Sequence, residues 1–393
     1  MKTFNEKALY IYKFIGQCLP IYAFYPILFL ERGITVSGVA VLIALWSVFT
    51  IAFEIPAGIL ADRWNRRNML AIAAVLQGIG FVIWFFSHTF FMFALGFFFW
   101  AIAGAFTSGT EEGLIYDNLK SDGREDDFTK VYGKSQFFAV IGVLVGIGSA
   151  GAIAIFVSVE AIAIISAVIC FVNVLFALRI REMNLYSKGK DEKSAGVFET
   201  LKKATSFIKG SGLALACILF LVLFGIGAYM DEFDALIANE WDISALWVSG
   251  ILVVRFAFTA LGDILAPMVE KKIKSVRQIL LINVIACVLL AVFAAIWNWY
   301  ALLFFGIAFM LMAITQILLV NALQKEIKEE GRATVMSFFS MGQNIAMIIL
   351  SLVFAALLSI ITLQQTYIII SIYGIVGGLA FCLFFAKIKS KRT

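Results

Sequence analysis

The amino-acid sequence predicts an all-α membrane protein with twelve transmembrane helices in two parallel six-helix repeats. Hydrophobic residues occupy 62% of the 393 positions and charged residues only 15%. The mean hydropathy of +0.97 lies outside the range of soluble globular domains. Apolar stretches of about 20 residues, the length that crosses a bilayer as a helix, recur along the whole chain.

The apolar stretches give the predicted helices in chain order, separated by short polar links. They cover residues 9–30, 36–61, 69–87, 91–116, 131–157, 160–179, 211–236, 245–268, 277–297, 299–322, 334–358 and 365–386. The longest polar segment lies near the middle of the chain. We therefore expect an N-terminal half at 1–180, a cytoplasmic linker at 181–210 and a C-terminal half at 211–393.

Basic residues predict the orientation of these helices. If the N-terminus is cytoplasmic, every basic link faces the cytoplasm and Arg32 alone lies outside. The positive-inside rule thus predicts a multi-pass protein of the cell membrane with both termini in the cytoplasm. The pI near 8.8 then reflects topology, so we expect no nucleic acid as a partner. We expect membrane lipid and a small-molecule substrate as partners, and a monomer.

The two halves of the sequence are related by a weak repeat. At an offset of about 209 residues, Glu31 aligns with Glu240 and Glu54 aligns with Asp263. Such an offset predicts that the two six-helix halves are parallel repeats, related by an axis along the membrane normal.

A charged segment after the second predicted span reads Gly-Ile-Leu-Ala-Asp-Arg-Trp-Asn-Arg-Arg. Its spacing resembles the signature loop between helices 2 and 3 of the major facilitator superfamily, with Asn65 where that family often has glycine. The resemblance implies a transporter that works by alternating access, and not an enzyme. It also implies a cytoplasmic gate built from Gly58, Asp62, Arg63, Arg66 and Arg67.

The arginines of this gate can hold a carboxylate, and Asp117 at the cytoplasmic end of the fourth span is the predicted partner. Alternatively, the arginines only set the topology.

The fifth span has a further partial resemblance, to the glycine-rich motif of drug-proton antiporters, with Ile147 at the motif's proline. Close packing by small residues is the alternative interpretation. The glycines concerned are Gly133, Gly142, Gly146, Gly148 and Gly151.

Charged residues inside predicted spans are candidates for proton coupling or for binding a charged substrate, because burying a charge in a membrane is costly. Arg255 lies about 15 Å into the eighth span by helical rise. Asp231, Glu232 and Asp234, in the outer half of the seventh span, are its predicted partners, unless that helix ends earlier and leaves them in an external loop. A second acidic set, nearer the cytoplasm, comprises Glu54, Glu111, Glu112 and Asp263. Its members are either proton carriers or parts of a structural ion pair with Lys13 or Arg66.

Aromatic and amide side chains on the central spans predict a cavity for an amphipathic compound, since aromatic faces accept many shapes. The predicted cavity residues are Tyr22, Tyr25, Trp46, Tyr229, Phe233, Gln136 and Asn344.

These observations favour a secondary transporter that exports amphipathic small molecules in exchange for protons, and proton-coupled uptake of an organic nutrient is the alternative. The sequence contains no nucleotide-binding motif, so we expect an ion gradient, H⁺ in the first place, and no cofactor. His88 is the only histidine and the five cysteines lack metal-ligand spacing, which argues against histidine catalysis and a metal site.

Overall fold

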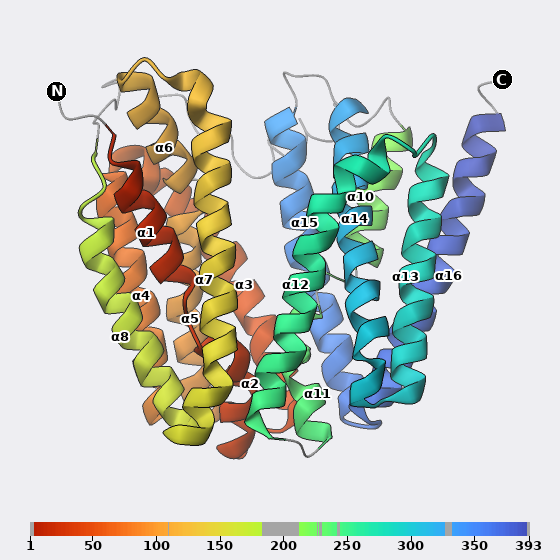
Figure 1. The fold of residues 1–393 in the computed structure, drawn as a ribbon, viewed down its shortest axis with the longest axis horizontal. Helices are drawn as coiled ribbons and strands as arrows, with labels where there is room; N and C mark the ends of the chain where they lie inside the picture. Colours follow the sequence, from red (N-terminus) through yellow and green to blue (C-terminus); the bar gives the residue numbers. More distant parts are fainter. Residues whose placement is uncertain are drawn as a thin grey trace. The chain divides into compact units, whose positions relative to one another are not determined.

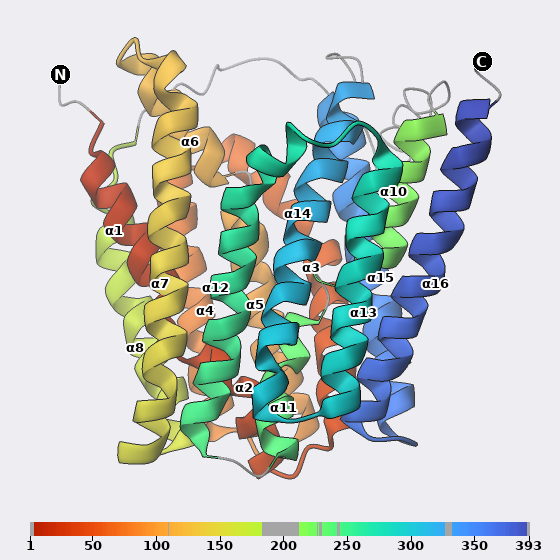
Figure 2. The same ribbon diagram turned by 45° about the vertical axis from the view of Figure 1, so that its right-hand side comes forward.

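The computed structural model describes residues 4–108, 110–182, 212–225, 227, 230–241, 244–326 and 332–390. Most of these residues are helical, as Figures 1 and 2 show, and eleven stretches among them are long and apolar enough to cross a membrane. A twelfth apolar helix, Gly212–Phe224, is shorter. Each of the twelve predicted spans falls on a helix or a pair of helices, so the predicted all-α membrane fold is confirmed.

The chain forms two compact units. The first comprises Met1–Glu192 with Asp242–Gly250, and the second comprises Lys193–Trp241 with Ile251–Thr393. The predicted boundaries at 180 and 211 remain a prediction, and most of the predicted linker lies outside the described residues.

The described residues of the first unit form eight α-helices. They are α1 (Glu6–Gln17), α2 (Ile21–Glu31), α3 (Val36–Arg63), α4 (Arg66–Phe86), α5 (Phe90–Thr107), α6 (Thr110–Ser121), α7 (Phe128–Phe156) and α8 (Val159–Ala177). Side-chain caps mark several of their starts: Thr35, Asn65, Thr89 and Ser158 each accept a backbone N–H at the first turn of the helix that follows.

Helices α4 and α5 pack closely because small residues face each other. A Cβ on Gly80 would lie 2.8 Å from the carbonyl oxygen of Gly96, and a Cβ on Gly96 would collide with the indole of Trp84. The Trp84 indole N–H donates to the carbonyl of Phe93 at 3.0 Å. The buried indole of Trp84 also contacts the rings of Tyr25, Phe29 and Phe97, so an aromatic cluster forms part of the core of the first unit.

The second unit comprises α10 (Gly212–Phe224), α11 (Ala235–Glu240), α12 (Ala245–Glu270), α13 (Val276–Ile296), α14 (Leu302–Glu326), α15 (Arg332–Leu358) and α16 (Leu363–Ser390). Helix α12 begins in the segment grouped with the first unit. A 3₁₀ turn, η3 (Asp231–Phe233), precedes α11. Helix α13 packs along both α14 and α16, as Figures 1 and 2 show.

Three predicted spans are interrupted in the structure, which corrects the expectation of continuous helices. The span 9–30 breaks between α1 and α2 at Pro20, which has no N–H to continue a helix; the N–H of Ile21 donates to Ser166 Oγ at 3.1 Å. The span 91–116 breaks at Ser108, whose backbone is extended. The span 211–236 ends as a helix at Phe224, where Gly225 and Gly227 follow.

Candidate functional site

The second unit contains a buried ion pair between Arg255 on α12 and Asp234, which lies between η3 and α11. Asp234 is 0% exposed and Arg255 is 5% exposed. The guanidinium Nε of Arg255 donates to Asp234 Oδ2, and the hydroxyl of Tyr367 on α16 donates to Oδ1 at 2.5 Å. Both carboxylate oxygens therefore have a hydrogen-bond donor, as a buried charge requires.

The same guanidinium also contacts the interrupted segment and the wall of a cavity. The terminal nitrogen Nη2 of Arg255 donates to the carbonyl oxygen of Gly227 at 2.7 Å, and Gly227 lies beyond the end of α10. The guanidinium carbon of Arg255 lies 4.0 Å from the ring centroid of Phe309, a cation–π contact. Arg255 thus ties the break after α10 to α14.

The predicted acidic partners of Arg255 are only partly placed by the structure. Asp234 pairs with it, but not through one face of a continuous helix, because Asp231 and Glu232 lie in the turn η3. The side chain of Asp231 lies outside the description, and Glu232 is half-buried. The prediction that three acids share an outer helix is therefore wrong. The helix ends earlier, at Phe224, as the alternative supposed, but Asp234 is buried and does not lie in an exposed loop.

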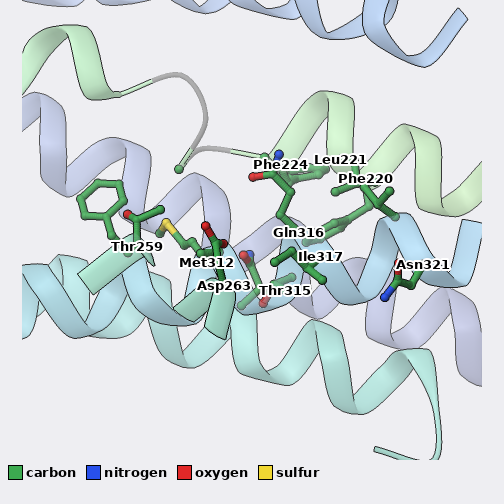
Figure 3. A pocket seen from close by; sticks show the side chains of 16 residues that line it. Phe220, Leu221, Phe224, Thr259, Asp263, Met312, Thr315, Gln316, Ile317 and Asn321 are labelled. Carbon is green, nitrogen blue, oxygen red and sulfur yellow. The ribbon is translucent and has the colours of Figure 1, made fainter. Parts of the chain in front are cut away.

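A cavity of about 600 Å³, here called the second-unit cavity, adjoins this ion pair. Figure 3 shows side chains from α10, α12 and α14 around it. Gly227 and Phe309 line this cavity and contact Arg255, so the ion pair supports part of its wall. The lining also includes the aromatic rings of Phe220 and Phe224 and the thioether of Met312.

Asp263 on α12 supplies the one charged side chain among the described residues that line the second-unit cavity. Hydrogen-bonding groups accompany it: the lining polar side chains are Thr259, Asn283, Thr315, Gln316 and Asn321. The cavity can therefore hold a ligand that combines an apolar body with a cation or with several hydrogen-bonding groups. Glu54, the repeat partner of Asp263 in sequence, lies on α3 with an exposed side chain.

The first unit contains a second polar cluster, formed around Lys13 on α1 and Glu111 on α6. Lys13 Nζ lies 2.8 Å from Glu111 Oε2, and both side chains are at least nine-tenths buried. A cavity of about 60 Å³ adjoins this pair, and Gln17, Gln77 and Asn173 also line it. Of the two acids predicted at this level, Glu111 takes the ion-pair role, while Glu112 accepts a hydrogen bond from the Tyr132 hydroxyl at 3.1 Å.

Gln77 and Asn173 were not among the sequence-predicted site residues. Each is a single amide inside a long apolar stretch, and that contrast is the signal that identifies them. Asn173 Oδ1 and Glu111 Oε1 are buried and accept no hydrogen bond from the described residues. The cavity of about 60 Å³ beside Lys13 and Glu111 is therefore lined by residues with acceptor atoms for a proton, a water molecule or another small donor.

The signature segment forms the end of α3 and the start of α4. Arg66 donates to Asp117 Oδ2 at 2.7 Å, so the arrangement joins the two residues that the gate hypothesis paired. The backbone N–H groups of Arg66 and Arg67 donate to the Glu182 carboxylate at 3.1 and 2.7 Å, which places an anion at the N-terminus of α4. Gly58, Asp62 and Arg63 lie within α3, but the side chains of Asp62 and Arg63 lie outside the description.

Glycine at position 113 allows Arg66 to reach its partner. A Cβ on Gly113 would lie 2.3 Å from a terminal guanidinium nitrogen of Arg66. This is closer than real Cβ contacts, so any larger residue at 113 would displace the arginine. Gly113 could not be predicted from the sequence, because nothing in the local pattern relates it to Arg66.

The glycines of α7 have different surroundings. Cβ atoms on Gly142 and Gly146 would meet the backbone of Phe14 at 2.3 Å and of Leu19 at 2.6 Å. The N–H of Gly151 donates to Ser249 Oγ at 2.7 Å, whereas a Cβ on Gly133 would meet nothing within 4 Å, and Gly148 is exposed. Gly142 and Gly146 therefore permit close packing of α7 on the α1–α2 break.

Two of the predicted cavity aromatics are core residues instead. Tyr25 packs among the rings of Trp84 and Phe97 and is 1% exposed. Phe233, also 1% exposed, stacks on Phe354 with ring centroids 4.3 Å apart. Both rings lie in apolar cores because aromatic burial against other rings is favourable.

Four of the other predicted cavity residues are partly buried: Tyr22, Trp46, Gln136 and Asn344. The Tyr22 hydroxyl accepts a hydrogen bond from the Gln77 amide at 3.0 Å. The ring centroids of Trp46 and Trp100 lie 5.5 Å apart. Gln136 and Asn344 are half-buried, and Tyr229 lies outside the described residues. The aromatic lining of the second-unit cavity comes from other residues, Phe220, Phe224 and Phe309, which the sequence does not distinguish from lipid-facing phenylalanines.

Comparisons with known proteins agree with this architecture. A family model described as the Major Facilitator Superfamily matches residues 14–329. The uncharacterized MFS-type transporter YfkF of Bacillus subtilis (strain 168) is 34% identical over 59 residues, and the match covers 15% of each chain.

Solved structures resemble the whole chain. The nucleoside transporter NupG is 16% identical, with 97% of this chain and 98% of that one covered and a TM-score of 0.80. A D-xylose-proton symporter is 13% identical, with 95% and 96% covered and a TM-score of 0.73. At these identities the similarity concerns the fold.

Proposed function

The chain belongs to the Major Facilitator Superfamily and is a multi-pass membrane transporter rather than an enzyme, and we propose that it exports amphipathic organic cations in exchange for protons. Transporters of this family use ion gradients without a cofactor. The proposed transport cycle rocks two six-helix halves, residues 1–180 and 211–393, about the substrate site. In this proposal both termini are cytoplasmic, the protein lies in the cell membrane, and it acts as a monomer.

The observation that carries the proposal is the position of Asp263 in the second-unit cavity. It is the one charged side chain among the described lining residues, and aromatic rings surround the same space. A carboxylate with aromatic neighbours binds an organic cation through charge attraction and cation–π contacts. A lipophilic body fits the remaining apolar wall.

Exchange of the substrate for protons would follow because the two compete for the Asp263 carboxyl group. The Asp263 carboxyl can carry a proton or face a cationic substrate, but one negative charge does not neutralise both. Protonation from the side of higher proton concentration then releases the substrate, and substrate binding on the other side releases the proton. The D-xylose-proton symporter, which by its name moves protons with its sugar, has a similar fold, and this likeness supports H⁺ as the coupling ion.

Proton-coupled uptake of a polar organic nutrient is the second candidate, and one observation favours it. The cavity also presents the amides of Asn283, Gln316 and Asn321 and the hydroxyls of Thr259 and Thr315. Such groups bind an uncharged polar ligand by hydrogen bonds. In that case substrate and proton would move in the same direction.

Flux measurements in proteoliposomes with an imposed pH gradient test both candidates. Tetraphenylphosphonium serves as the amphipathic cation, and a nucleoside and a hexose serve as uncharged polar probes. Cation movement opposite to the proton flux, lost in Asp263→Asn and kept in the control Asp126→Asn, supports antiport; Asp126 is an exposed residue outside the cavity.

Two results contradict the antiport proposal. Movement of a polar probe in the direction of the proton flux, without movement of the cation, would establish uptake instead. Cation exchange that persists in Asp263→Asn would show that another carboxyl couples the fluxes, with Glu111 the next to test.

A further inference from the structure

We propose that a groove between α1 and α7 binds an anionic phospholipid of the surrounding bilayer. In this arrangement an acyl chain lies along the apolar floor of the groove and the phosphate lies between Lys7 and Lys134. The inference concerns a surface of the first unit and does not depend on the substrate or the direction of transport.

The floor of the groove is apolar. A volume of about 390 Å³ is bordered by Tyr10, Ile11 and Phe14 from α1 and by Phe138 and Ile141 from α7, with Lys7 at one end. Ile11 remains 42% exposed. In Figure 1, α1 and α7 lie next to each other at the front of the first unit.

The groove lies where α1 and α7 pack against each other, and the two helices come close together at one end of it. A Cβ on Gly142 would lie 2.3 Å from the carbonyl oxygen of Phe14, so α7 reaches the α1 backbone there. Toward the other end, Tyr10 and Phe138 stack with centroids 5.3 Å apart. These rings form a flat wall suited to a hydrocarbon chain.

The groove lies in the membrane. Its α1 residues belong to the apolar span Glu6–Glu31 and its α7 residues to the span Glu125–Phe156. Exposed apolar surface at that depth faces lipid, so an acyl chain is the ligand that the surroundings supply.

The charged end of the groove distinguishes this site from an ordinary lipid-facing surface. Lys7 and Lys134 lie at the same end, Lys7 in the lining and Lys134 Nζ 5.0 Å from the Tyr10 ring centroid. Neither ammonium lies within ion-pair distance of a carboxylate among the described residues.

The nearby acid does not cancel this positive charge. The Glu6 carboxylate accepts a hydrogen bond from the Tyr10 hydroxyl at 2.9 Å and forms an ion pair with Arg124, also at 2.9 Å. Two ammonium groups at the end of an apolar groove therefore complement a lipid phosphate. Basic sites between membrane helices bind anionic headgroups by this combination of contacts.

Native mass spectrometry of the purified full-length chain, titrated with phosphatidylglycerol and separately with phosphatidylcholine, tests the proposal. We expect the wild-type chain to retain phosphatidylglycerol in preference to phosphatidylcholine. Lys7→Gln/Lys134→Gln should weaken phosphatidylglycerol binding by about fivefold per lysine, the factor that corresponds to about 1 kcal/mol per basic residue. The matched control Lys271→Gln/Lys272→Gln removes two exposed charges outside the groove and should leave binding unchanged.

A second variant tests the groove itself. Ile11→Trp fills the floor at an exposed position and should also weaken phosphatidylglycerol binding, whereas Val168→Trp, at a 54% exposed position on α8, should not. Equal retention of both lipids by the wild-type chain would overturn the proposal. So would binding that survives the double lysine variant, or that depends on the lysines but is unchanged in Ile11→Trp.

Discussion

Arg255 on α12 forms a buried ion pair with Asp234, a residue that lies beyond the helix break following Phe224. The pair connects three parts of the second unit, because Tyr367 on α16 donates to the same carboxylate and Arg255 donates to the Gly227 carbonyl. An interruption that would otherwise leave polar backbone groups unpaired inside a membrane is thereby stabilised by a side chain.

Removing one member of this pair should destabilise the protein strongly. Arg255→Gln or Asp234→Asn leaves one buried charge without its partner, and we expect a loss of about 3–5 kcal/mol. Tyr367→Phe removes one hydrogen bond to the carboxylate and should cost less, about 1.5–3 kcal/mol. Unfolding in nanodiscs measures these changes. The double variant Asp234→Asn/Arg255→Gln should lose less than the sum of the two single variants, and strict additivity would contradict the interpretation.

Lys13 and Glu111 should behave in the same way in the first unit. Lys13→Met leaves Glu111 buried and unpaired, so we expect a loss of about 3–5 kcal/mol, largely recovered in Lys13→Met/Glu111→Gln. Lys325 serves as the control, because its pair with Glu270 at 2.8 Å is exposed. Lys325→Met should change stability by less than about 1 kcal/mol. Equal effects of the buried and exposed substitutions would show that the Lys13 pair has no special importance.

Gly113→Ala should impair transport more than stability. The added methyl group displaces the Arg66 guanidinium from Asp117, and a lost coupling contact of this kind reduces the transport rate by roughly twofold to thirtyfold. Gly104→Ala is the matched control, since a Cβ there meets nothing within 4 Å. Transport assays in proteoliposomes compare the two variants, and equal rates would argue against the Arg66–Asp117 contact as part of the gate.

Asp122, in the link between α6 and α7, should make stability depend on pH. Burial alone would raise its pKa, but the Phe4 N–H at 2.7 Å and the Arg181 guanidinium at 2.8 Å outweigh burial, so the pKa lies below its ordinary 3.8. Because the folded-state pKa is below the unfolded one, the stabilisation is complete above the ordinary value. It is lost as the pH falls through the lower folded value.

The thermal unfolding midpoint should therefore decline as the pH is lowered below about 4. Asp122→Asn should start from a lower midpoint and flatten this dependence. Arg181→Gln should make this decline smaller, since it removes one of the groups that lower the folded-state pKa and so brings that pKa closer to the unfolded value, at which the decline begins. A wild-type pH dependence in Asp122→Asn would exclude this carboxylate as its source.

The positions of the helices follow from hydropathy alone because each membrane helix satisfies its own backbone hydrogen bonds. The pairing of Arg66 with Asp117 was also predictable, since both lie at the same predicted membrane boundary. The breaks after Gln17 and Thr107 were not predictable, and an earlier end of the seventh span, now placed at Phe224, was only an alternative interpretation. A glycine or proline in an apolar stretch is compatible with a continuous helix unless a neighbouring element offers hydrogen bonds to the interrupted backbone.

For the candidate site, too, some residues could be predicted from the sequence and others could not. Intramembrane charge identified Arg255, Asp234, Glu111 and Asp263 as unusual residues, because an ionised side chain in an apolar span requires a partner or a cavity. It did not identify Lys13 as the partner of Glu111 in particular, or the phenylalanines that line the second-unit cavity. Lipid-facing and cavity-facing phenylalanines have the same local sequence context.

Composition and the lengths of the apolar stretches were therefore sufficient for the membrane fold and the helix order, since these depend on interactions local in sequence. The family resemblance came from the spacing of the charged segment that runs from Gly58 to Arg67. The tertiary structure alone decided which polar groups meet. Lys13 and Glu111 are 98 residues apart, and Asp234 and Tyr367 are 133 apart. A buried polar group requires a partner of suitable chemistry, but only the packing of distant helices determines which residue lies within hydrogen-bond distance.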